Sequence, residues 1–228
     1  MRWPYGVRMR WDWVPVSAAA LVTGAMALAF ASLLSPTSES SGDTLRIVQQ
    51  EDGRWMVVAV IFFIASVALT LGLPAALSVF PGRGRGLSMV AGVVLAVGFL
   101  GTAGYSMLMV FFRALVITQA IRDKALEDVT SEAGLTVFLV GWIVAFFLGE
   151  LLLAIALLRA RTTPTWVPVL LLMHVATIFV SRFLPDAVSK GTVLLLAVAL
   201  AGIAIQAVTS DTLARRPRGH HAGIPQRI

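Results

Sequence analysis

The sequence predicts an all-α membrane protein, a bundle of about six transmembrane helices with both chain ends in the cytoplasm. Of its 228 residues, 58% are hydrophobic and only 13% are charged, whereas soluble domains carry roughly 25% charged residues. The mean hydropathy is +0.87, and a single soluble core of this length cannot bury so much apolar surface. Basic residues are concentrated in alternate polar segments, as in multi-pass membrane proteins. We therefore predict one transmembrane domain over residues 1–212.

Six segments are long and apolar enough to cross a membrane, because a spanning helix needs roughly 20 mostly apolar residues. Short polar segments separate them, and a helical conformation pairs every backbone group inside the hydrocarbon. The predicted spans cover residues 14–35, 55–80, 88–112, 136–158, 166–184 and 192–209.

The first span has a second interpretation. Arginines precede it, and an Ala-Phe-Ala sequence at residues 29–31 lies near its end, which is also the pattern of a cleavable signal peptide. Cleavage would leave five spans. We expect the segment to be retained as a transmembrane helix.

The later spans and the segments between them carry local signals. Pro74 lies deep in the second span and predicts a kink, whereas Pro168 lies in the first turn of the fifth, where a missing N–H costs nothing.

Residues 36–53 are predicted to be a polar loop. Residues 113–130 show helical spacing and are predicted to extend the third helix or to lie along the membrane surface. The basic residues 213–228 are predicted to be a disordered tail near anionic headgroups.

The distribution of charge predicts the orientation. With the N-terminus inside, the cytoplasmic side holds eleven arginines and two acidic residues, Asp12 and Asp211, which gives a net charge of +9. The outer side holds seven basic and nine acidic residues, which gives a net charge of −2. The high net charge is therefore a topology signal, and no nucleic-acid partner is expected. The glycine- and arginine-rich turn at residues 81–86 lacks the strand–loop–helix context of a phosphate-binding loop, which favours a plain inner turn.

Small residues recur at helical spacing and predict close helix packing in the membrane. One such stripe in the fourth span consists of Gly141, Ala145 and Gly149. The same spacing is found at Gly98, Thr102 and Ser106 in the third span and at Ala197 and Ala201 in the sixth.

Glu150 is the one carboxylate inside a predicted span. Intramembrane acids usually face the bundle interior or a water-filled cavity. His174 lies in the next span, and at 1.5 Å per residue both groups are roughly 13–14 Å from the inner helix boundary. Adjacent helices joined by a short turn are neighbours, so a contact between the two is plausible. The pair would handle a proton or polarise a ligand; the structural alternative is a hydrogen bond that only stabilises the bundle.

Three further side chains are candidate ligand contacts. Ser66 and Thr70 lie at a similar depth beside the proline kink, although hydroxyls there also serve helix packing. Tyr105 could join Arg113 and Arg182 in a site for an anionic lipid headgroup at the outer side. Snorkelling to the interface explains both arginines without such a site.

The residues and motifs that several classes of chemistry require are absent from the sequence. The absence of cysteine excludes disulfides, thiolate metal sites and cysteine nucleophiles. HExxH, G-x-S-x-G and Walker sequences are missing, and one carboxylate with one imidazole in the membrane is too few for a metal site. No metal and no cofactor is expected.

The segment 159–166 (RARTTPTW) and the Gly72-Leu-Pro74 sequence resemble an uncharacterised family of bacterial, often actinobacterial, six-helix membrane proteins. The resemblance covers most of the chain in its layout. It implies a multi-pass protein of the bacterial cytoplasmic membrane, and it implies no activity and no site residues.

Three functions remain open. The first is binding or transport of a lipophilic or amphipathic small molecule inside the bundle, with Glu150 as the polar handle. The second is an intramembrane isomerase or cyclase for a lipid-soluble substrate, with Glu150 as general acid and His174 as its partner. The third is an accessory subunit that packs against another membrane protein or a second copy of itself. A pocket that contains both groups would favour the enzyme.

Overall fold

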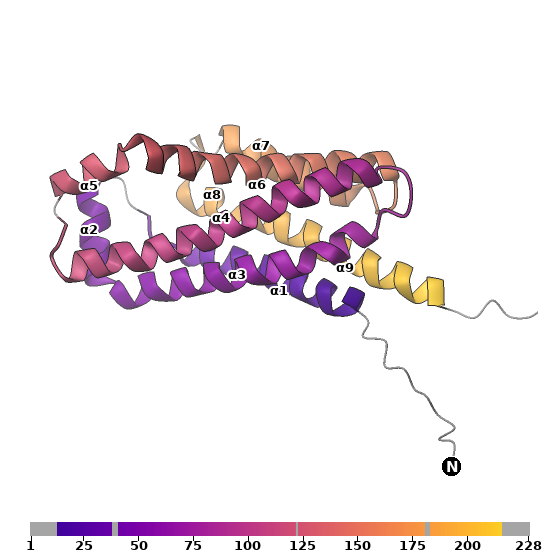
Figure 1. Cartoon of the computed structure of the whole chain (residues 1–228), viewed down its shortest axis with the longest axis horizontal. Helices are drawn as coiled ribbons and strands as arrows, with labels where there is room; N and C mark the ends of the chain where they lie inside the picture. Colours follow the sequence, from indigo (N-terminus) through magenta and orange to yellow (C-terminus); the bar gives the residue numbers. More distant parts are fainter. Residues whose placement is uncertain (1–12, 38–40, 122, 181–182, 216–228) are drawn as a thin grey trace, which may run out of the picture.

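The computed structural model describes residues 13–37, 41–121, 123–180 and 183–215, and throughout these ranges the regular structure is helical, with no strand. Long helices lie side by side, and the short helices α2 and α5 lie together at one end (Figure 1). The helices are α1 (Trp13–Leu34), α2 (Ser41–Gln50), α3 (Asp52–Ser78), α4 (Arg85–Ile117), α5 (Asp123–Thr130), α6 (Ala133–Ala160), α7 (Trp166–Val180), α8 (Asp186–Gly191) and α9 (Val193–Arg215).

Five helical segments are long and apolar enough to cross a membrane, which makes this a multi-pass membrane protein. They are α1, α3, α4, α6 and the α8–α9 segment Asp186–Leu213. The predicted span 166–184 is too long, because α7 has only 15 residues. At 1.5 Å per residue it measures about 22 Å, against a hydrocarbon core of about 30 Å.

The prediction of a polar loop over residues 36–53 is wrong, because this segment contains the amphipathic helix α2. Leu45 and Val48, three residues apart on one helix face, are buried against Val116 and Leu126. The acidic and polar residues of the other face dominate the composition of the segment and conceal this spacing.

Helix α9 continues to Arg215, six residues beyond residue 209, where the last predicted span ends. The rest of the predicted tail, including His220 and His221, lies outside the described residues.

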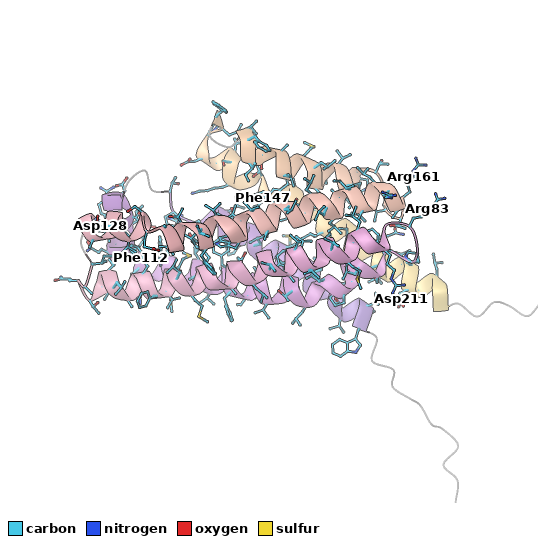
Figure 2. The ribbon with its side chains drawn as sticks, turned by 45° about the horizontal axis from the view of Figure 1, so that its top comes forward. Arg83, Phe112, Asp128, Phe147, Arg161 and Asp211 are labelled. Carbon is cyan, nitrogen blue, oxygen red and sulfur yellow. The ribbon has the colours of Figure 1, made fainter. Side chains whose placement is uncertain are left out.

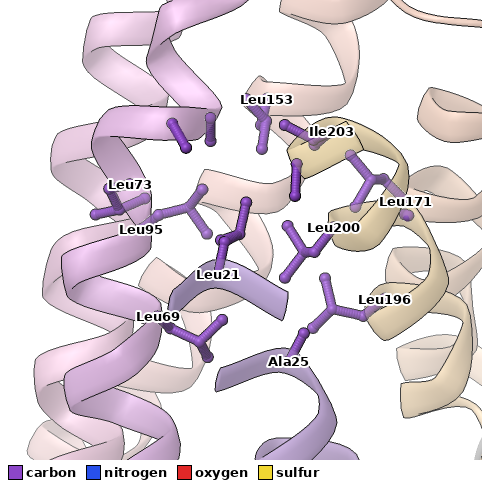
Figure 3. Close-up of a cluster of buried hydrophobic side chains, with 14 of the residues drawn as sticks. Leu21, Ala25, Leu69, Leu73, Leu95, Leu153, Leu171, Leu196, Leu200 and Ile203 are labelled. Carbon is purple, nitrogen blue, oxygen red and sulfur yellow. The ribbon is translucent and has the colours of Figure 1, made fainter. Parts of the chain in front are cut away.

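Helix α1 belongs to the centre of the core, between α3 and α9. Leu21 of α1 is fully buried and lies among leucines of α3 and α9, including Leu69 and Leu200 (Figure 3). An antiparallel contact with α3 is very close, because a Cβ added to Gly72 would lie 2.6 Å from the Cα atom of Leu21. Only a glycine at this position allows the two backbones to approach so far.

A hydroxyl of α1 is inserted beside Pro74 of α3. Ser17 Oγ donates a hydrogen bond to Leu71 O at 2.7 Å and accepts one from Ala75 N at 3.0 Å. It thus bonds to both the donor and the acceptor of the i→i−4 pair formed by Ala75 and Leu71. A side chain inserted into the helical ladder beside a proline is a recognised cause of helix bending.

Helices α4 and α6 also pack through glycines. A Cβ added to Gly98 would lie 2.6 Å from Phe146 Cα, and one added to Gly149 would lie 2.7 Å from Leu95 N. The predicted stripe of α4 is buried, because Gly98, Thr102 and Ser106 all belong to the buried residues of this helix. The predicted stripe of α6 is wrong at Gly141, where an added Cβ meets no atom within 4 Å.

The two ends of the bundle differ in charge. Arg83 and Arg161 lie at one end together with Asp211, while Asp128 lies at the opposite end (Figure 2). We call these the arginine end and the α2–α5 end. The first turn of α1 and the last turn of α9 both lie at the arginine end (Figure 1).

Candidate functional site

Glu150 of α6 and His174 of α7 meet inside the bundle. They are 1% and 6% exposed, and His174 Nδ1 lies 3.0 Å from Glu150 Oε1 and 2.9 Å from Oε2. The expected contact between these two side chains is confirmed.

The local sequence explains why both side chains point inward. Glu150 shares a helix face with the buried residues Leu153 and Leu157, three and seven positions later. His174 follows the buried Val167 and Leu171 by seven and three positions. Each polar residue therefore lies on the stripe by which its helix faces the core.

The orientation of the His174 ring is set on two sides. Glu150 holds Nδ1, and the ring stacks on Phe147 with centroids 5.5 Å apart and an interplanar angle of 25°. Across the described residues, His174 Nε2 has no hydrogen-bond partner. A carboxylate that holds one ring nitrogen determines what the other nitrogen can do.

The direction of the bond between the pair depends on the tautomer of His174. Where Nδ1 of a neutral ring accepts from a protonated Glu150, the hydrogen of the ring is on Nε2, which is then a donor. Where Nδ1 of a neutral ring donates to Glu150, Nε2 is an acceptor. In both cases Nε2 can form a hydrogen bond with a ligand.

His174 lines a cavity of about 320 Å³. Its walls come from α1, α3, α4, α6, α7 and the α8–α9 region, and the side chains that matter below are Phe62, Tyr105, Trp142, Phe147 and His174. Glu150 is not among the lining residues. It lies behind His174 and reaches the cavity only through the imidazole.

The shortness of α7 helps to form this cavity. Helix α7 ends at Val180, and Ser189, Thr192 and Val193, from α8 and the start of α9, line the cavity with His174. At about 22 Å, this α-helix is well short of a full crossing of the hydrocarbon core. Non-helical backbone at membrane depth is tolerated where it is buried in protein or lines a cavity.

Two further polar groups of the cavity lack partners among the described residues. The indole Nε1–H of Trp142 is buried without an acceptor. The hydroxyl of Tyr105 makes no hydrogen bond, and its ring lies 5.8 Å from the Trp142 ring. Trp142 was not predicted from the sequence, which carries no signal for it because residues on every face of this helix are apolar.

Ser66 and Thr70 are placed elsewhere. Ser66 Oγ donates to the carbonyl of Phe99, and Thr70 Oγ1 donates to Ser66 O at 2.8 Å. Neither residue lines the cavity. Their hydroxyls are satisfied by backbone carbonyls, as helix-packing hydroxyls are, so the structure does not bring them to the site.

Arg113 is engaged in an ion pair. Its NH2 group lies 2.5 Å from Asp52 Oδ2 of α3, and Arg182, its expected companion, lies outside the described residues. Within the described ranges, no group of three or more His, Asp or Glu side chains is arranged to hold a metal ion.

Comparison with known protein families, curated proteins and solved structures finds no match to this chain. The resemblance noted from its sequence therefore stays a prediction. The fold defines the class, a multi-pass helical membrane protein with a buried polar pair and a cavity beside it.

Proposed function

We propose that this protein binds a lipophilic or amphipathic small molecule within its bundle, with His174 as the polar contact. The observation that supports this most is the unpartnered Nε2 of a buried histidine that lines a cavity and is held from behind by Glu150. If Glu150 and His174 only stabilised the bundle, no cavity would be required beside Nε2 of His174.

The cavity has the character of a ligand site. Small-molecule pockets are mostly apolar, occupy about 300–1,000 Å³ and carry a few polar groups that fix orientation. At about 320 Å³ the cavity is within this range, and phenylalanines accompany His174, Trp142 and Tyr105 in its walls. The indole Nε1–H of Trp142 is a donor, and we propose the same for Nε2 of His174, which carries the ring hydrogen when Nδ1 accepts from a protonated Glu150. The ligand should therefore present a hydrogen-bond acceptor such as a carbonyl oxygen.

We further propose six membrane segments, with α7 as a short sixth one, and the arginine end in the bacterial cytoplasm. The positive-inside rule supports this orientation. It puts α2 and α5 at the outer surface of the membrane.

Photolabelling tests the proposed function. The probe is a butanoyl monoacylglycerol, an ester with a carbonyl acceptor, with a diazirine beside the carbonyl, offered to the protein in lipid nanodiscs. Labels are expected on residues that line the His174 cavity. His174→Phe should lower this labelling about tenfold, because one charge-assisted or well-aligned hydrogen bond contributes about 1.5 kcal/mol.

Met173→Phe is the matched control, because the adjacent Met173 is 50% exposed on the outside of the bundle. It should label like the wild type. Equal labelling of the His174→Phe protein, or labels found only on lipid-facing residues, would contradict the proposal.

An acid–base enzyme is the second candidate, and the position of Glu150 behind His174 favours it. A base oriented by a second group is the arrangement of activated catalytic pairs. In that case His174 Nε2 exchanges the proton with the substrate, and Glu150 is its positioning partner. Glu150→Gln should then retain binding and lose turnover. A lipid product found in membranes with the wild type and absent with Glu150→Gln would support the enzyme.

A further inference from the structure

A second cavity of about 390 Å³ lies at the α2–α5 end of the bundle. Its walls are almost entirely apolar and include Trp55, Met109, Phe112, Leu126 and Leu139. We call it the end chamber. Phe112 marks its position in Figure 2, toward the α2–α5 end, whereas Phe147 of the His174 cavity lies further along the bundle.

Tyr105 lines both the His174 cavity and the end chamber. Its ring lies between Phe62 of α3, with centroids 6.1 Å apart, and Trp142 of α6, at 5.8 Å. Its hydroxyl has no partner among the described residues, so no hydrogen bond holds the ring in place. One side chain, held by ring packing and not by a hydrogen bond, is therefore shared between the two cavities.

The two cavities follow one another along the bundle. On α4, the lining residues extend from Thr102 in the His174 cavity to Leu115 in the end chamber. At 1.5 Å per residue this is a length of about 20 Å. The combined space is long and mostly apolar, and the unpartnered ring nitrogens of His174 and Trp142 lie at its His174 side.

We propose that the two cavities are one elongated site for a single-chain amphiphile. This rests on the proposed function and names its ligand class: a headgroup with a carbonyl or similar acceptor, on a long unbranched hydrocarbon chain. The acceptor binds the N–H groups of His174 and Trp142. The chain passes the displaced Tyr105 ring and occupies the end chamber.

The shape and the lining support a chain rather than a ring system. A flexible chain can pass a single aromatic side chain and fill two successive narrow cavities, whereas a rigid fused ring cannot. The polar groups without partners are gathered at one side, so only one end of the ligand needs to be polar. The end chamber offers the other end apolar contacts and almost no polar ones.

Two photoreactive monoacylglycerols test this inference in nanodiscs. The first is the butanoyl probe with its diazirine beside the ester carbonyl, and the second is a hexadecanoyl probe with its diazirine at the chain terminus. The short probe should label the His174 cavity. The long probe should label end-chamber residues such as Leu126 and Leu139.

A variant that fills the end chamber sharpens the test. Leu139→Trp should lower labelling by the long probe about tenfold, since overpacking a filled cavity is strongly unfavourable, and should leave the short probe unaffected. Val137→Trp is the control, because Val137 is 72% exposed on the outside of the same helix. If melting shows that Leu139→Trp does not fold, Leu108→Trp, which fills the same chamber from α4, takes its place.

The outcomes separate the two proposals. If the short probe labels the His174 cavity while the long chain ends on lipid-facing residues, or if filling the chamber changes nothing, the elongated site is wrong and the proposed function stands. If neither probe labels the His174 cavity, the proposed function falls and the elongated site falls with it.

Discussion

Glu150 and His174 illustrate how a buried polar residue depends on a partner from another helix. Neither forms a side-chain bond to its own helix, and each is almost fully buried. That both residues lie at a similar level along the bundle was predictable from helix rise, since it depends only on counting residues from the turn between α6 and α7. Their contact also required two helix rotations, and these became known only from the structure.

A double-mutant cycle should show strong coupling between these two residues. Glu150→Leu or His174→Leu alone leaves a buried polar group without its partner and should lower the free energy of unfolding by about 3–5 kcal/mol. The double variant removes both groups and should lose much less than the sum. The measurement is reversible unfolding in mixed micelles. Additive effects would show that the contact between the two side chains contributes nothing to the free energy of unfolding.

The hydroxyl of Ser17 should also stabilise the fold measurably. Ser17→Ala leaves the N–H of Ala75 and the carbonyl of Leu71 without their partner, at a cost of about 1–3 kcal/mol. Ser78→Ala is the control, because the exposed Ser78 hydroxyl bonds only to Ala75 O in its own helix. Equal unfolding free energies for the two variants would mean that the bridge to α3 is unimportant.

At the scale of helices, glycine positions decide how closely neighbours pack. Gly98 of α4 faces the backbone of Phe146, whereas Gly141 of α6 faces open space. Both are helix-interior glycines in apolar sequence, and the sequence analysis assigned both to packing stripes. Only the rotation of each helix distinguishes a contact glycine from one on the outside of the bundle.

Alanine at these two glycines should act in opposite directions. Gly98→Ala forces α4 and α6 apart and should destabilise the protein by about 1–3 kcal/mol. Gly141→Ala meets no atom and should be neutral or stabilising by up to about 1 kcal/mol, since alanine is the better helix former. Thermal unfolding in detergent measures both. A stabilising Gly98→Ala would contradict the close contact.

The start of α6 is capped by a carboxylate. Glu132 accepts a hydrogen bond from Leu135 N at 2.6 Å, and the backbone N–H groups of Gly134 and Leu135 hold the pKa of Glu132 below its usual range. A lowered pKa in the folded state means that the ionised group stabilises the fold at neutral pH. This stabilisation is lost as the pH falls from the usual carboxyl range through the lowered value.

The melting temperature should therefore fall more steeply with acidification in the wild type than in Glu132→Gln. The comparison covers roughly pH 6 to pH 3, around the ordinary glutamate pKa of about 4.3. Glu132→Asp, which keeps a capping carboxylate, should follow the wild type. Parallel curves for the wild type and Glu132→Gln would mean that the cap is not formed.

On the scale of the whole molecule, the arginine end and the α2–α5 end predict its orientation in the membrane. The chain contains no cysteine, so single cysteines report accessibility directly. With a membrane-impermeant maleimide on intact cells, Gly42→Cys and Ser131→Cys should react, and Gly82→Cys should react only after permeabilisation. Labelling of Gly82→Cys in intact cells would reverse the proposed orientation.

The sequence alone was sufficient for the helical class, for the position of most apolar helices and for the similar level of Glu150 and His174 along the bundle. These properties depend on composition and on counting along one helix. A carboxylate inside an apolar span is conspicuous because hydrocarbon makes it costly. Amphipathic α2 was missed because its two buried residues are few beside its polar face.

The tertiary structure decided which face of each long helix is buried. In a soluble helix this face is visible as an apolar stripe, but here the residues that face lipid are as apolar as those that face the core. For the same reason the sequence could not show that Trp142 and Tyr105 join His174 around one cavity, or that Ser66 and Thr70 do not. Residue types and depths are properties of one chain segment, whereas the cavity depends on the rotations and lengths of several helices together.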